Sequence, residues 1–274
     1  MPVFEIVPNL SEGRDSTTID LAVEAAQRCG ATVLHRTSDA VHHRSVITIA
    51  GGPEAVCGAA VAIAGVAVQR IDLREHSGVH PRMGALDVLP FVPLGDATMA
   101  QAVELAHEAG RRIWESYAVP SFYYGEAALS PQRRALPDVR PNPVGPPDVG
   151  TLPPHPTAGA VAVGARPLLV AFNVELETGD LGVARSIARR VRARDGGLKT
   201  LRAMAFPLHE GAVQVSLNVT DERATPLYRV FEIVRSLAAE YGVRVRRGEL
   251  IGCVPRSAVA SAALYALGVE EPIP

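Results

Sequence analysis

The feature that most constrains this chain is a proline-rich segment that separates two runs of alternating strand and helix patterns. Prolines recur from position 131 to position 156, and residues 129–159 show neither helical nor strand periodicity. A loop this long inside a compact chain is usually functional or disordered, and prolines restrict the unfolded ensemble. We therefore predict an ordered binding segment here, with a plain linker between subdomains as the alternative.

The half of the chain before this segment has a mixed α/β pattern. Apolar residues recur at helical spacing ahead of Gly30, and Thr98 and Gln101 have the spacing of a capping box. The predicted strands are residues 3–7, 31–34, 45–50, 86–94 and 121–124, and the predicted helices are residues 17–29, 53–68 and 98–117.

The half after the segment reads strand, helix, strand, strand, helix, strand. The predicted strands are residues 168–174, 200–206, 212–219 and 243–246, the predicted helices are 180–194 and 226–241, and a last helix starts at Pro255. This order is that of a split-βαβ, ferredoxin-like sheet with helices on one face. Residues 159–166 contain glycines and are predicted to precede the first of these strands.

Together the two patterns predict an α+β protein with two α/β subdomains, residues 1–167 and 168–274. With 47% hydrophobic residues, the chain has enough apolar surface for two cores. We expect each subdomain to be a mixed sheet with helices on its outer face. The crevice between the two sheets is the expected ligand site.

Composition excludes several classes of function. A net charge of -2 gives no electropositive field for nucleic acid or an anionic membrane. The most apolar stretch, residues 55–68, is too short to span a bilayer, and the N-terminus lacks the pattern of a secretory signal. Three scattered cysteines form no metal or disulfide framework, which favours the cytoplasm. Phosphate-loop, dinucleotide and hydrolase-elbow motifs are absent from the sequence.

The densest group of chemistry-bearing residues lies at 76–87, where two histidines, an arginine and an aspartate surround two glycines ahead of an apolar strand. Such a loop exposes polar groups beside a rigid element. Pro81 restricts His80 to an extended conformation. The alternative is a tight connection whose histidines bond only backbone. No metal site is predicted, because His76 and His80 have ligand spacing only in a helix, which the glycine and proline between and after them oppose.

A second polar cluster, residues 38–45, precedes the predicted strand 45–50. In an extended chain His42 and His43 point in opposite directions, so we expect one to be solvated and the other packed. Arg44 is more informative, because a guanidinium near a strand entrance can pair bidentately with a carboxylate. A surface ion pair is the alternative for Arg44.

Six segments, in order along nearly the whole chain, carry a family resemblance. They are EIVPNLSEGRD (5–15), HSGVHPRMGALDVLPFVPL (76–94), VPSFYYGEAA (119–128), GAVAVGARPLLVAFNVEL (159–176), QVSLNVTD (214–221) and GELIGCVP (248–255). They resemble the formimidoyltransferase domain, the amino-terminal part of formimidoyltransferase-cyclodeaminase. The resemblance implies two α/β subdomains with a folate-binding crevice, usually in a homodimer.

The resemblance also implies site residues. His80 of the HPRMG block is expected to be the catalytic acid/base, and Asp39 is carried over as a supporting residue because it lies near His43-Arg44, where the family has an Asn-Arg pair. The segment between Arg140 and Pro147 is shorter than in the animal enzymes. The folate-binding stretch aligns with Gly150, Thr151, Leu152, Pro153, Pro154, His155, Pro156, Thr157, Ala158 and Gly159.

The implied reaction moves a formimidoyl group from N-formimidoyl-L-glutamate to nitrogen 5 of tetrahydrofolate, the co-substrate, without a metal. Arg44 or Arg82 is expected to bind a glutamate carboxylate, and Asp87 to orient His80 or face the cationic formimidoyl group. Asn173, from the second half, is a candidate substrate contact. The sequence leaves the choice among these roles open.

Three alternatives remain at this stage. A formyl-transferring relative that uses N-formylglutamate would share every motif, a folate carrier without turnover would keep the crevice but not require His80, and a scaffold acting through subunit contacts would show no folate affinity. Because the sequence carries no cyclodeaminase domain, we expect a separate protein to process the 5-formimidoyl product.

Overall fold

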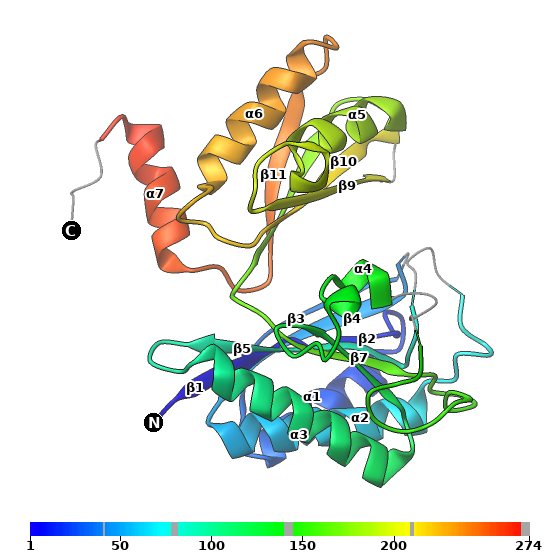
Figure 1. Ribbon diagram of the computed structural model, residues 1–274. Coiled ribbons are helices and arrows are strands. Elements are labelled where there is room, and N and C mark those ends of the chain that lie inside the picture. The colour runs from blue at the N-terminus through cyan, green and yellow to red at the C-terminus, as the bar shows by residue number, and fades with distance from the viewer. Residues whose placement is uncertain (41, 78–81, 140–144, 209–210, 270–274) are drawn as a thin grey trace. The chain divides into compact units, whose positions relative to one another are not determined.

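A computed structural model describes residues 1–40, 42–77, 82–139, 145–208 and 211–269. The chain divides into two compact units, Met1–Pro167 and Leu168–Pro274 (Figure 1). Both units combine a β-sheet with α-helices, which confirms the predicted α+β class of two α/β subdomains.

The first unit is built on a seven-stranded mixed sheet. Its strands are β1 (Val3–Ile6), β2 (Asn9–Leu10), β3 (Thr32–Asp39), β4 (Arg44–Gly51), β5 (Leu86–Leu94), β6 (Ser121–Gly125) and β7 (Val161–Ala165). β5 pairs with β7, and β7 with β6, in parallel, whereas the other pairings are antiparallel. β4 and β5 therefore run in the same direction on either side of β1 and β2.

β1 and β2 are two pieces of one interrupted strand. Both lie between β4 and β5, and Asn9 is paired with Val46 on one side and Val88 on the other. The interruption falls at Val7-Pro8, as expected for a residue that cannot donate to the ladder. The Pro8 carbonyl still accepts from the backbone N–H of Ile47 at 3.1 Å. β4 and β5 both begin at the end of the sheet where β2 ends.

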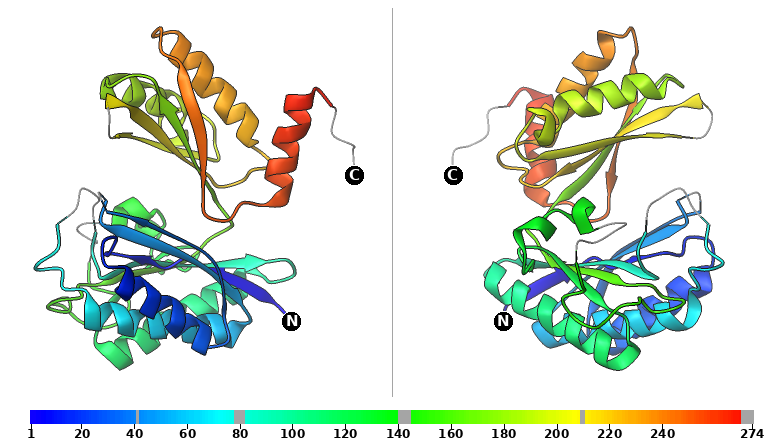
Figure 2. Two further views of the ribbon diagram at one scale, coloured as in Figure 1. Left: turned by 180° about the vertical axis from the view of Figure 1, so that it is seen from behind. Right: turned by 45° about the vertical axis from the view of Figure 1, so that its right-hand side comes forward.

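Three helices cover one face of this sheet: α1 (Ser16–Arg28), α2 (Pro53–Arg70) and α3 (Met99–Tyr117) (Figures 1 and 2). Asp15 caps α1, Pro53 occupies the first turn of α2, and the predicted capping box of Thr98 and Gln101 is present in α3. The main core lies between these helices and the sheet. The short helix α4 (Leu136–Val139) lies on the opposite face, where Val139 packs with Phe122.

The second unit has a four-stranded sheet in the order β11-β8-β10-β9. Its elements are β8 (Val170–Leu176), α5 (Leu181–Val191), β9 (Leu201–Pro207), β10 (Val213–Val219), α6 (Leu227–Ala239), β11 (Val245–Ile251) and α7 (Arg256–Leu267). This is the predicted split-βαβ order. Every pairing in this sheet is antiparallel, so the prediction of a mixed sheet is wrong for the second unit. The reason is that an antiparallel strand lies between the two parallel strands of each βαβ crossover.

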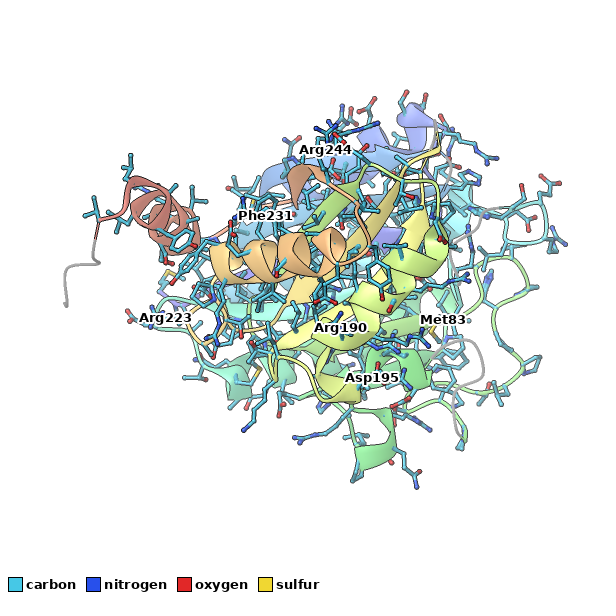
Figure 3. All side chains as sticks on the ribbon, turned by 90° about the horizontal axis from the view of Figure 1, so that it is seen from above. Met83, Arg190, Asp195, Arg223, Phe231 and Arg244 are labelled. Atoms are coloured by element: carbon cyan, nitrogen blue, oxygen red, sulfur yellow. The ribbon has the colours of Figure 1, made fainter. Side chains whose placement is uncertain are left out.

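Helices α5 and α6 lie together on one face of this second sheet (Figure 3). Figure 3 labels Arg190 on α5 and Phe231 on α6. Arg190 forms an ion pair with Glu240 at 2.5 Å, and Phe231 packs against Phe172 of β8 with ring centroids 6.4 Å apart.

Several predicted boundaries are wrong. Residues 161–165 form β7 rather than a connection, and β3 continues to Asp39, past the predicted end at residue 34. The proline-rich segment holds a 3₁₀ turn, Pro131–Arg133, as well as α4, and a second 3₁₀ turn lies at Ala193–Asp195. Pairing with neighbours in the sheet, rather than local pattern, decides where such strands start and stop.

None of the helices in the described ranges is both long and apolar enough to cross a membrane.

Candidate active site

A group of polar residues in the first unit is centred on Arg44, on the sheet face that α1, α2 and α3 leave open. Side chains alternate along β4, so that Ile47 and Ile49 enter the main core while Arg44 and Val46 point to the other face. Asn9 of β2 and Asp87 of β5 flank Arg44 at the same end of the sheet. Strand topology thus brings together residues that are far apart in sequence.

Arg44 and Asp87 form a buried ion pair at the centre of this group. Arg44 Nη1 lies 2.7 Å from Asp87 Oδ2, and the two side chains are 13% and 0% exposed. Arg44 Nη2 donates to Asn9 Oδ1 at 2.8 Å, and the backbone N–H of Met83 donates to Asp87 Oδ1 at 2.8 Å. The carboxylate therefore ties β4 to the loop before β5.

Glu12 links the turn after β2 to the turn between β3 and β4. Its Oε1 accepts from the backbone N–H groups of Arg14 and Asp15, at 2.7 and 2.9 Å, and lies 3.0 Å from His43 Nε2. Burial alone would raise the pKa of Glu12, but the two backbone bonds and His43 outweigh it and lower that pKa. Gly13 makes the approach possible, since a Cβ there would lie 2.2 Å from the Asp39 carbonyl oxygen.

His43, His76 and Arg82 form a chain of contacts. The rings of His43 and His76 lie 3.9 Å apart at an interplanar angle of 20°. Arg82 Nη1 lies 2.6 Å from His76 Nε2. Burial, the charge of Arg82 and the proximity of His43 lower the pKa of His76, so its neutral form is favoured at neutral pH.

Asp39 lies at the end of β3, in the hairpin turn beside this group. It accepts from the backbone N–H of His42 at 2.8 Å, and its other oxygen lies 2.8 Å from His42 Nδ1. His42 is the more exposed of the adjacent histidines and His43 is the packed one, as the sequence predicts. Asp39 is about half exposed and so keeps its carboxylate near solvent.

The C-terminal part of the predicted folate segment pairs with the loop that carries Arg82 and leads into β5. Ala85 donates to the Ala158 carbonyl at 2.8 Å, and Leu73 donates to the Thr157 carbonyl at 2.9 Å. Residues 151–154 are exposed. The segment 150–159 is therefore anchored at one end and open to solvent in its middle.

Two glycines allow this pairing. A Cβ on Gly84 would lie 1.9 Å from the Ala160 carbonyl oxygen, and one on Gly159 would lie 2.3 Å from the Met83 carbonyl oxygen. Gly159 also has a φ of +69°. His155 closes the turn, because its Nδ1 accepts from the Ala158 backbone at 3.0 Å.

Two predicted site residues are not placed in this group. His80 lies outside the described residues. Asn173 belongs to β8 of the second unit, where its side-chain amide donates to Glu249 at 3.3 Å and Ser216 is its cross-strand partner.

Sequence reasoning missed Asn9 and Glu12 and gave His43 no specific role. Asn9 and Glu12 stand in the first resembling segment, residues 5–15, but polar residues in a loop gave no signal of which strands they would meet. The predicted residues Arg44, Arg82 and Asp87 do lie in the same group, together with the hairpin turn that carries Asp39.

The sequence of the chain matches two family models that together span both units. The formiminotransferase domain, N-terminal subdomain, matches residues 3–166, and the formiminotransferase domain matches residues 171–272. The chain belongs to the formiminotransferase family.

Relatives within the formiminotransferase family align with almost the whole of this chain. A glutamate formimidoyltransferase of Streptococcus pyogenes serotype M1 is 39% identical, with 98% of this chain and 94% of the relative covered. One of Thermoplasma acidophilum is 38% identical, with 97% and 93% covered. The formimidoyltransferase-cyclodeaminase of Gallus gallus is 38% identical over 98% of this chain, which spans 53% of that longer formiminotransferase relative.

Proposed function

We propose that this protein is a glutamate formimidoyltransferase that moves the formimidoyl group of N-formimidoyl-L-glutamate to nitrogen 5 of tetrahydrofolate. The observation that carries the proposal is the match to two proteins of that name, at 39% and 38% identity over 98% and 97% of this chain. The polar group on the open sheet face supports it, because its arginine, histidine and carboxylate side chains suit a zwitterionic amino-acid donor.

The proposed chemistry needs one group that moves a proton. Nitrogen 5 of tetrahydrofolate attacks the formimidoyl carbon and gives a tetrahedral intermediate, whose bond to the glutamate nitrogen then breaks. A proton leaves nitrogen 5 and one is delivered to the departing glutamate nitrogen. A histidine suits both transfers because its ordinary pKa is near neutrality. We assign this role to His80.

Two arginines of the group are candidates for binding a substrate carboxylate. Arg44 forms an ion pair with Asp87, at 2.7 Å. Arg82 lies one residue before the backbone N–H that binds Asp87, and it contacts His76 and the His42 carbonyl. We assign the glutamate carboxylate to Arg82, with Arg44 and Asp87 holding the loop in place, and Asp39 facing the cationic formimidoyl group.

The folate is assigned to residues 150–159. The anchored end at Thr157 to Gly159 gives the segment a fixed base beside Asp87, and exposed Leu152 and the prolines after it offer apolar surface. Prolines also limit the entropy that is lost when a segment binds.

The deciding experiment is a turnover assay on the purified protein with tetrahydrofolate and either N-formimidoylglutamate or N-formylglutamate. Formimidoyl transfer with a much higher kcat/KM than formyl transfer supports the proposal. Faster formyl transfer replaces it with the second donor, and folate binding without turnover of either donor replaces it with the carrier function.

We further propose that the protein acts in the cytoplasm as a homodimer and passes its product to a separate cyclodeaminase. Size-exclusion chromatography with light scattering tests the dimer. Cyclisation of the product only after a purified cyclodeaminase is added tests the hand-over.

A further inference from the structure

His43 joins two separate segments through both of its ring nitrogens. Nε2 lies 3.0 Å from Glu12 Oε1, and Nδ1 lies 3.0 Å from the Ser77 carbonyl oxygen. The residue is 9% exposed, and its φ of +50° is uncommon for a residue with a side chain. Packing and both hydrogen bonds therefore hold His43 in a conformation that the local chain disfavours.

The two partners of His43 both require a hydrogen-bond donor from the ring. A carboxylate oxygen and a carbonyl oxygen both accept hydrogen bonds, whereas a neutral imidazole has only one N–H to donate. Both contacts are hydrogen bonds only when both nitrogens carry a proton. Glu12 supplies the compensating negative charge, and its lowered pKa keeps it ionised at neutral pH.

The groups around His43 are consistent with a cationic ring. His76 stacks on it in the neutral form that burial and Arg82 favour, so the stacked imidazole adds no positive charge next to His43. Among the residues that the structure describes, the charged or titratable groups that contact His43 from neighbouring segments are Glu12 and His76, and Arg82 contacts His76.

Ser77 stands at the start of the loop that leads to Arg82 and Asp87. The other end of that loop is held by the bond from Met83 to Asp87, and Arg82 donates to the His42 carbonyl at 3.3 Å. Both ends of the stretch between Ser77 and Met83 are thus tied to the hairpin turn that carries His43 and Arg44. By sequence, that stretch contains His80.

We propose that His43, charged and oriented by Glu12, is a positioning residue that fixes the Ser77 carbonyl, where the chain enters the stretch that contains His80 by sequence. This proposal rests on the proposed function for its effect on turnover. It does not rest on that function for its effect on the loop. His43 acts on kcat rather than on folate binding, because it touches the loop and not the folate segment.

Two amide variants separate the two bonds of His43. In His43→Asn the amide nitrogen takes the place of Nδ1 and keeps the bond to Ser77, whereas in His43→Gln it takes the place of Nε2 and keeps the bond to Glu12. We expect His43→Asn to retain kcat within about threefold and His43→Gln to lose about 10- to 100-fold, with little change in folate KM, because small misplacements of a reacting group cost that much. Equal losses, or the opposite order, would overturn the proposal.

Hydrogen exchange of the free protein gives a readout that does not need catalysis. Amides on the two sides of the loop, in peptides covering residues 75–77 and 82–85, are expected to exchange faster in His43→Gln than in His43→Asn. If wild-type protein shows no transfer activity but this difference is present, the proposed function fails and the positioning role stands. Identical exchange in both variants refutes the positioning role.

Glu12→Gln tests the charge separately and remains informative if a His43 variant does not fold. The amide keeps an acceptor for His43 but removes the counter-charge that orients the ring, so we expect the amides of residues 75–77 to exchange faster than in wild type. Unchanged exchange in this peptide would contradict the role of Glu12. His35→Gln, on the exposed part of β3, is the matched histidine control and should match wild type in both assays.

Discussion

Arg44, the first residue of β4, and Asp87, the second residue of β5, form an ion pair of 2.7 Å whose carboxylate is fully buried. The two strands are not neighbours, because β2 lies between them and contributes Asn9 to the same guanidinium. The pair therefore links the starts of the two strands that flank β2. Because the pair is buried, removing one partner should cost much stability, whereas replacing both partners by apolar residues should cost little.

Removing the charge of Asp87 alone should destabilise the first unit. Asp87→Asn leaves the 13% exposed guanidinium of Arg44 without its buried counter-charge, and we expect a loss of about 3–5 kcal/mol in the free energy of unfolding. Urea denaturation measures it. The double variant Arg44→Met with Asp87→Leu should lose less than the sum of the two single changes; additive losses would show that the pair is not coupled.

His80→Ala should lower turnover by about 10²- to 10⁴-fold, the usual contribution of a positioned acid/base. Folate affinity, measured by calorimetry, should change much less, since proton transfer is not part of binding. His35→Ala is the control, because His76 stacks on His43 and is not a neutral position. Wild-type turnover in a folded His80→Ala protein would refute the assignment of His80 as the acid/base.

Folate should shield the middle of the segment 150–159. Leu152 is 57% exposed, so a cysteine placed there in a background without native cysteines should react readily with a maleimide. We expect saturating folate to slow labelling of Leu152→Cys several-fold. Leu129→Cys, 64% exposed in the same proline-rich segment but outside 150–159, should label at the same rate with and without folate. Equal slowing of labelling at both positions would contradict specific shielding of residues 150–159 by folate.

Glu5 should make the free energy of unfolding depend on pH. Burial raises the pKa of this β1 carboxyl above its ordinary value of 4.5, and Arg166 offsets the effect only in part. A raised pKa means that the folded state holds the proton more tightly, so the stabilisation is present at acid pH and is lost as the pH rises above 4.5 towards the folded value.

The test is the melting temperature of Glu5→Gln relative to wild type between pH 5 and pH 8. The amide does not titrate, so the melting temperature of the variant should rise relative to that of wild type as the pH rises. Glu104→Gln, an exposed position on α3, should show no such trend. A constant difference for Glu5→Gln would mean that Glu5 is ionised throughout this range.

The sequence by itself determined the elements whose signals are local. The capping box of α3, the proline at the start of α2 and the strand and helix order of the second unit all follow from residues within a few positions of one another. The blocks shared with the formiminotransferase family also lie in continuous segments. These signals give the fold class and single out Arg44, Arg82 and Asp87 as candidate site residues.

Only the tertiary structure decided how these residues meet. Glu12 and His43 are 31 positions apart, and Arg44 and Asp87 are 43 apart, so no local pattern reports their contact. β1 and β2 occupy one strand position in the sheet, and β7 pairs with β5. Both arrangements depend on side-chain packing between strands that are distant in sequence. The physical reason is that hydrogen bonds and ion pairs between distant segments form only after the chain has closed the loops between them.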